Sequence, residues 1–199
     1  DEARGGRRGR GARAARPRPL THGPRATPAA TAPRETQYAA RVSAPSRVWS
    51  ETPDHAIGEW RNVLLTGWRG DITVGALETS RVASHDLHAR HPDGLVVFNV
   101  VSHLIPVPDG PVRRKASSVL GETGGHVRCT ATVIEGEGFW VSTARAVVAT
   151  ITLLSRASHP HRVFATIDEA AQWAETFVVG DGARATELGS VARALLGRV

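Results

Sequence analysis

The sequence predicts a mixed α/β domain in which helices pack on a largely parallel or mixed sheet. Short runs rich in Val, Leu and Ile alternate with segments of helical periodicity between residues 47 and 180. Clusters of Gly, Pro and Asp separate these segments. Strands that alternate with helices are joined by crossovers, so we expect a largely parallel or mixed sheet in the order β-β-α-β-α-β-α-β-α.

Five segments are short, apolar and bounded by turn residues, as strands are. The expected strands cover 47–51, 62–68, 95–101, 127–134 and 162–165. The run LVVFNVV at 95–101 is almost continuously apolar, which is typical of a strand covered on both faces. Segment 127–134 alternates instead, with Cys129 among the residues of one face, so we expect one face to be more buried than the other.

Helical spacing of apolar residues predicts helices over 71–89, 111–123, 139–155, 166–178 and, weakly, 184–196. Asp71 is the expected N-cap of the first helix, and Pro111 suits the first turn of the second. Thr166 to Glu169 fits the T-x-x-E capping box. The β-branched content of 139–155 leaves a strand as the alternative there.

Positive charge is concentrated at the start of the chain. Residues 1–47 hold 11 Arg and three acidic residues, a net charge of +8, whereas residues 48–199 hold 14 Lys or Arg and 16 acidic residues, a net charge of −2. Residues 1–46 carry too few apolar side chains to offset the ~1–2 kcal/mol per residue of backbone entropy lost on ordering. We expect a disordered tail over 1–46, a domain over 47–180 and a polar C-terminal extension with a weak helix over 181–199.

Several classes of protein do not fit the rest of the sequence. No apolar run approaches the ~18 residues needed to span a bilayer, and the single cysteine, Cys129, suits a reducing compartment. The sequence lacks dinucleotide-binding, P-loop and nucleophile-elbow motifs. We therefore expect a cytoplasmic protein without a membrane span, and without catalytic residues, bound metal or cofactor.

Four phrases carry a family resemblance: GEWRNVLLTGWRGDIT (58–73), PDGLVVFNVV (92–101), VIEGEGFWVSTARAV (133–147) and VFATIDEAAQW (163–173). With the element order, they resemble the STAS-like group of bacterial domains, which includes the SpoIIAA-like relatives. The resemblance covers residues 47–178. It implies a mixed α/β sheet of four to five strands with helices packed mainly on one face. It also implies a domain without catalysis of its own that acts as a partner-switching regulator, as a cytoplasmic part of an anion transporter, or as a binder of nucleotides or lipids.

Regulatory members of that group carry a phosphorylatable Ser or Thr in a D-S-[ST]-G-like phrase, at the start of the helix after the central strand. No such phrase is present here, and Ser102 is the nearest hydroxyl to that position. The resemblance therefore implies Ser102 as the candidate switch residue.

Arg113, Arg114 and Lys115 form the one dense basic cluster of the predicted domain. They fall in the first turn of a predicted helix, where free N–H groups favour anions. The loop after a central strand is also where open α/β sheets tend to place ligands. We predict ligand or partner binding at Ser102, Arg113, Arg114 and Lys115, with a solvated helix face as the alternative for the basic cluster.

Histidines and tryptophans offer weaker candidates. His85, His88 and His91, with Asp86 between them, could suggest a metal site, but solvated helix histidines are the better interpretation, as they are for His159 and His161. We expect core or rim packing for Trp60, Trp68, Trp140 and Trp173. Exposure of Trp60 and Trp68 would instead indicate a partner surface.

The first hypothesis for function is a non-enzymatic STAS-like regulatory or ligand-binding module. It would act through a protein partner or a small anionic or lipid ligand, and a homodimer is open. One alternative is an enzyme with a site near the histidines or the 135–138 turn. Another is a nucleic-acid-associated protein that uses its basic tail, although nucleic acid is not the favoured partner.

Overall fold

A single six-stranded sheet organises the part of the chain that the computed structural model describes, residues 44–102, 105–136, 138–155, 158–180 and 184–197. The strands follow the sequential order β1-β2-β3-β4-β5-β6. Strands β1 (Arg47–Glu51), β2 (His55–Trp60) and β3 (Val63–Trp68) pair antiparallel. From β3 onward the pairing is parallel, through β4 (Leu95–Val101), β5 (Val127–Ile134) and β6 (His161–Phe164). The mixed α/β fold class is confirmed.

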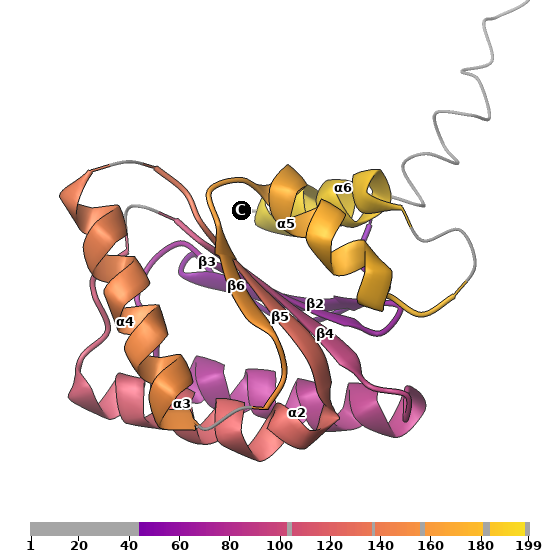
Figure 1. Ribbon diagram of the computed structural model, residues 1–199, viewed down its shortest axis with the longest axis horizontal. Coiled ribbons are helices and arrows are strands. Elements are labelled where there is room, and N and C mark those ends of the chain that lie inside the picture. The colour runs from indigo at the N-terminus through magenta and orange to yellow at the C-terminus, as the bar shows by residue number, and fades with distance from the viewer. Residues whose placement is uncertain (1–43, 103–104, 137, 156–157, 181–183, 198–199) are drawn as a thin grey trace, which may run out of the picture. The chain divides into compact units, whose positions relative to one another are not determined.

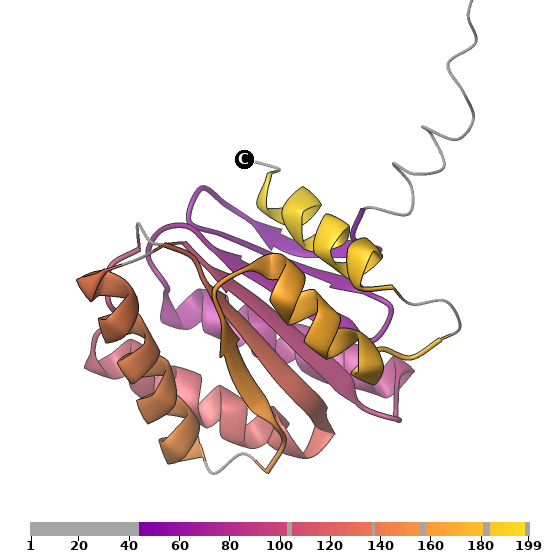
Figure 2. The same cartoon turned by 45° about the horizontal axis from the view of Figure 1, so that its top comes forward.

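Helices cover both faces of this sheet (Figures 1 and 2). The crossovers α2 (Val74–Arg90), α3 (Gly110–Thr123) and α4 (Phe139–Ser155) lie on one face. On the other face lie α5 (Ile167–Ala174) and α6 (Ala185–Leu196). Short 3₁₀ turns, η1 (Gly124–His126) and η2 (Glu175–Phe177), follow α3 and α5. The expectation is a sheet of four to five strands with helices mainly on one face. The structure corrects it, because the sheet has six strands and helices cover both faces.

Strand β2 is the element that the sequence does not predict. Its sequence, HAIGEW, contains Gly58 and Glu59, residue types that are depleted in strands. The structure compensates for the buried Glu59: Arg90 donates to its two carboxylate oxygens at 2.9 and 2.7 Å, and Trp49 Nε1 donates at 2.9 Å. Because these partners come from β1 and α2, the short segment alone does not reveal them.

The face under α5 and α6 holds the denser core. Alternate residues of β3, β4 and β5 point to it, among them Leu65, Phe98 and Cys129. Burial raises the pKa of the Cys129 thiol to about 12, so this cysteine stays protonated and unreactive. Helix α6 differs from the weak helix expected in a polar extension, because its apolar face, which includes Leu188 and Leu195, is buried in this core.

The helix starts are set by side-chain caps. Thr166 Oγ1 accepts from the backbone N–H of Glu169, as the capping-box sequence predicts. Helix α3 is capped by Asp109, with Pro111 in its first turn as expected. Helix α2 begins later than predicted, because the residue that accepts from a first-turn N–H is Thr73 rather than Asp71.

We predict that truncating α6 at its core contact destabilises the fold. Leu188 is fully buried, so Leu188→Ala should lower the free energy of unfolding by about 2–5 kcal/mol. Leu153 is 79% exposed, so Leu153→Ala is the matched control and should change little. Urea denaturation followed by tryptophan fluorescence measures both, and an α6 that does not pack on the sheet would give equal, small effects.

A candidate ligand pocket under helices α2, α3 and α4

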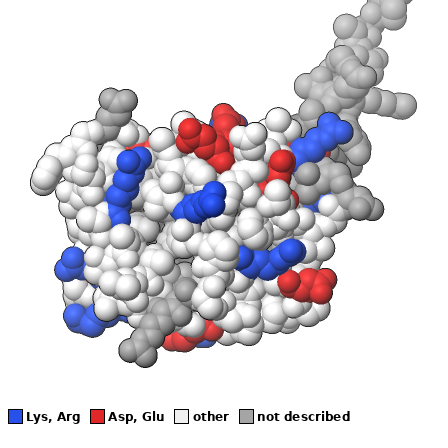
Figure 3. All heavy atoms as spheres, viewed as in Figure 1, with Lys and Arg blue, Asp and Glu red and all other residues white. Residues whose placement is uncertain are grey.

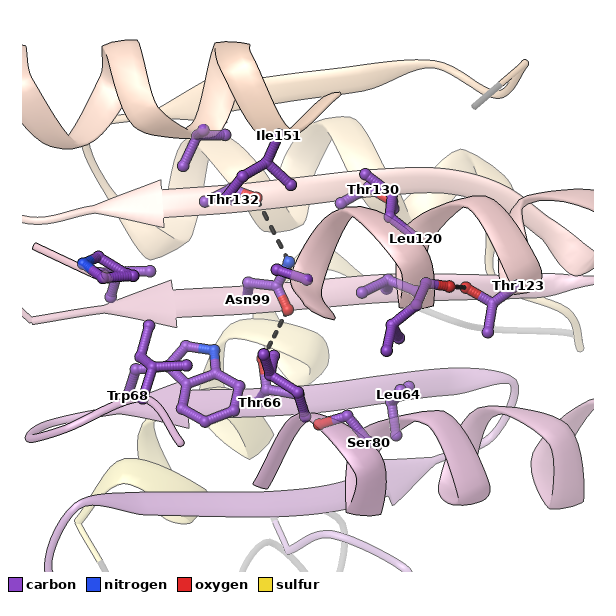
Figure 4. Close-up of a pocket in the computed structure, with 18 of the residues that line it drawn as sticks. Leu64, Thr66, Trp68, Ser80, Asn99, Leu120, Thr123, Thr130, Thr132 and Ile151 are labelled. Atoms are coloured by element: carbon purple, nitrogen blue, oxygen red, sulfur yellow. Dashed lines mark hydrogen bonds between the residues drawn. The ribbon is translucent and has the colours of Figure 1, made fainter. Parts of the chain in front are cut away.

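An elongated pocket lies between the sheet and helices α2, α3 and α4 (Figure 4). Its larger part has a volume of about 180 Å³, and a second part of about 80 Å³ adjoins it. The two parts share Ile72, Val101, Pro108, Val148 and Ile151. The described residues that line them include no Asp, Glu, Lys or Arg.

The central strand shows that the helices do not seal this face. In β4, the residues that point to α5 and α6 are at most 3% exposed: Val96, Phe98 and Val100. The alternate residues, which point to the pocket, are only half-buried: Val97, Asn99 and Val101. The apolar stripe of α3 that lines the pocket is half-buried as well: Val112, Ala116, Val119 and Leu120. Protein cores are normally close-packed, so an apolar gap at the centre of a sheet is a feature to explain.

A row of hydrogen-bonded side chains crosses the floor of the pocket, and we call it the polar row. Thr66 Oγ1 donates to Asn99 Oδ1 at 2.5 Å, and Asn99 Nδ2 donates to Thr132 Oγ1 at 3.4 Å, as Figure 4 shows. Thr132 Oγ1 lies 3.0 Å from His161 Nε2, and Thr152 Oγ1 lies 2.7 Å from His161 Nδ1. The row thus links β3, β4, β5 and β6 to helix α4.

The hydrogen bonds of the polar row indicate which ring nitrogen of His161 carries a proton. Thr152 uses its one hydroxyl proton on the Val148 carbonyl at 2.9 Å, so it accepts from His161 Nδ1–H. Thr132 accepts from the Asn99 amide and is therefore free to donate to His161 Nε2. The network accommodates a neutral His161 that is protonated at Nδ1.

Burial agrees with that assignment. Because burial, and to a smaller extent the neighbouring His159, disfavours the imidazolium, the pKa of His161 is lowered to about 4. At neutral pH the pocket floor therefore carries no charge. His159 is also held by a strand, since its Nε2 lies 2.9 Å from Thr130 Oγ1.

The predicted binding residues lie beside this pocket rather than in it. Ser102 follows β4, and its backbone N–H donates to the Trp68 carbonyl at 2.9 Å. Arg113 and Arg114 are exposed in the first turn of α3, and no ion pair is found for either among the described residues. Lys115 is half-buried and binds Glu78 of α2 at 2.7 Å. Hydrogen bonds from Arg81 and, secondly, from Lys115 lower the pKa of Glu78 to about 2. The ion pair between Lys115 and Glu78 joins α3 to α2.

The histidines of α2 form a ring cluster with His126 of η1, which the sequence does not reveal. The His88 and His126 rings stack with centroids 4.0 Å apart, and His85 lies 5.6 Å from His126. Across the described residues, no group of three or more His, Cys, Asp or Glu side chains is arranged to hold a metal ion. Trp60 and Trp68 are buried, so they pack in the core and do not form a partner surface.

Comparisons of the chain with protein-family models, curated proteins and solved structures find no match.

The polar row is the part of the site that the sequence interpretation misses. Its signal is a polar residue inside each of three apolar strands: Thr66 in VLLTGW, Asn99 in LVVFNVV and Thr132, the second of two threonines, in VRCTATVI. The pairing register aligns them, since Thr66 lies opposite Asn99 and Asn99 opposite Thr132. His161 and Thr152 join through tertiary packing, which no local pattern encodes.

We predict that His161 makes stability depend on pH. Its pKa is 6.5 in a model peptide and about 4 in the fold, so its contribution is complete above pH 6.5 and is lost as the pH falls toward 4. The free energy of unfolding should fall by on the order of 2–3 kcal/mol more in the native protein than in His161→Gln over this range. Urea titrations at pH 7 and pH 4.5 measure this, and parallel losses in the two proteins would contradict it.

Proposed function

We propose that this chain is a non-catalytic, STAS-like ligand-binding module that holds a small apolar molecule of the lipid class between its sheet and helices α2, α3 and α4. The observation that carries the proposal is the half-buried state of Val97, Asn99 and Val101 at the centre of the sheet. Those side chains face helices whose own apolar stripes are half-buried, so both sides of the gap present apolar surface to the same space.

The energetics favour a ligand in that space. Removing apolar surface from water contributes about 25 cal/mol per Å², and an enclosed apolar gap of about 150 Å³ is known to accommodate a benzene-sized molecule. The second part, toward Ile134 and Trp140, extends the space beyond the larger part, as the length of a hydrocarbon chain requires. A chain of this kind would complete the core on the open face.

Helix α4 is a wall of the pocket that buries few of its own side chains. Of its residues, Val141 is buried, whereas the apolar side chains Phe139, Leu153 and Leu154 are 88%, 79% and 64% exposed. Trp140 Nε1 fastens its first turn by donating to the Ile105 carbonyl at 3.0 Å. Near its other end, a Cβ at Gly121 of α3 would lie 3.1 Å from the Ser155 carbonyl oxygen, so the two helices approach closely there.

We predict that filling the pocket abolishes binding of an uncharged apolar probe, N-phenyl-1-naphthylamine, whose fluorescence rises on transfer from water. Ala116 lines the pocket, so Ala116→Phe should weaken probe binding at least about tenfold by occupying the space. Ala149 is exposed on α4, so Ala149→Phe is the control and should bind as the native protein does. Equal binding by all three proteins would contradict the proposed function.

A second candidate function is the docking of an anionic group at Arg113 and Arg114. Both guanidinium groups are exposed at the start of a 14-residue helix, where the backbone N–H groups favour negative charge. Basic side chains come close together at the lower left of Figure 3, the side on which α3 begins, whereas the other basic side chains on that face stand apart. The ligand would be a phosphate group or an acidic partner surface.

We predict that the double variant Arg113→Ser, Arg114→Ser lowers the affinity for inorganic pyrophosphate at least about fivefold at low ionic strength. Lys115 stays unchanged because its ammonium group already binds Glu78. The control removes two other exposed arginines, Arg145→Ser with Arg184→Ser. Isothermal titration calorimetry distinguishes the outcomes, and equal losses in both double variants would show a general charge effect instead of a site.

No helix in the described parts of the chain is long and apolar enough to cross a bilayer. A cytoplasmic location, a protein partner and a homodimer remain predictions of the sequence.

A further inference from the structure

We infer that the pocket selects an uncharged ligand and that the hydroxyl of Ser84 is the group that anchors it. This inference depends on the proposed function of the pocket as a ligand site. It adds the chemical class of the ligand, an aliphatic chain that carries one hydroxyl or carbonyl group, and it assigns a specificity role to a residue of α2.

The lining excludes a charged group. The described residues around both parts of the pocket include no acidic or basic side chain other than His161, which is neutral at pH 7.5 because burial lowers its pKa to about 4. An ionised carboxylate placed there would lose its hydration without gaining a cation, at a cost of several kcal/mol. A fatty alcohol or ester of the same length does not incur that cost.

The other hydroxyl groups that line the pocket are occupied. Ser80 donates to the Ala76 carbonyl at 3.2 Å, Thr123 donates to the Val119 carbonyl at 2.8 Å, and Thr130 contacts His159. Thr66, Asn99 and Thr132 belong to the polar row. Side-chain hydrogen bonds between protein groups thus account for the hydroxyls that line the pocket, with one exception.

That exception is Ser84. It lies one helical turn beyond Ser80, lines the pocket and is 3% exposed, yet its Oγ has no hydrogen-bond partner within the described part of the chain. A buried hydroxyl without a hydrogen-bond partner is unfavourable, so a ligand that supplies a partner binds more tightly than a ligand that does not. A ligand hydroxyl can donate a hydrogen bond to Ser84 and can also accept one from it. Ser80 lies one helical turn away on the same helix, so it is the natural control.

The test uses the full chain and displacement of N-phenyl-1-naphthylamine at pH 7.5 by three compounds that share a ten-carbon chain: 1-decanol, methyl decanoate and decanoate. We expect 1-decanol and methyl decanoate to displace the probe at concentrations at least about tenfold lower than decanoate. In Ser84→Ala, the affinity for 1-decanol should fall about five- to tenfold, the factor that corresponds to one buried hydrogen bond. Ser80→Ala should keep the native affinity, and thermal unfolding checks that both variants are folded.

Each contrary outcome has its own meaning. If decanoate competes as well as 1-decanol, the selection for an uncharged ligand is overturned while the proposed function stands. If Ser84→Ala and Ser80→Ala bind 1-decanol equally, the anchor role of Ser84 is overturned. If the probe itself binds no more weakly to Ala116→Phe than to the native protein, the pocket is not the binding site and the proposed function fails with the inference.

Discussion

The polar row is the interaction on which the open face of this structure depends. Asn99 lies in the central strand, and its amide needs hydrogen-bond partners there because a buried polar group without one is costly. Thr66 on one side and Thr132 on the other supply them only when β3, β4 and β5 keep their register. His161 and Thr152 extend the row to the edge strand and to α4, so the same hydrogen bonds that align the strands also position a wall of the pocket.

The same strands serve two faces with opposite properties. Toward α5 and α6, apolar side chains such as Phe98 and Leu188 are fully buried and form a close-packed core. Toward α2, α3 and α4, the helices hold one another partly through surface ion pairs such as Lys115 with Glu78, and their apolar stripes face a gap. We interpret the first face as the source of stability and the second as the binding face, which explains how the domain can leave apolar surface uncovered.

Local patterns predict much of this architecture, and tertiary partners determine the rest. The strand at 95–101 and the helix start at Thr166 can be recognised from residues that are close in the sequence, and both predictions are confirmed. Strand β2 depends on Arg90 to accommodate Glu59, and α6 depends on a core made by distant strands, so sequence periodicity underestimates both. For the site, the basic cluster can be recognised in the sequence. The buried hydroxyl of Ser84 without a hydrogen-bond partner can be recognised only in the structure, where α2 packs beside the pocket.

The central claim is that an apolar molecule enters between the sheet and α2, α3 and α4. The most direct measurement is a nuclear magnetic resonance titration of the ¹⁵N-labelled full chain with 1-decanol, observing the side-chain amide of Asn99 and the backbone amides. We expect saturable chemical-shift changes at Asn99 and along α3, where Ala116 and Leu120 line the pocket, with little change in α6. Shifts confined to α5 and α6, or no saturable shift at Asn99, would contradict it.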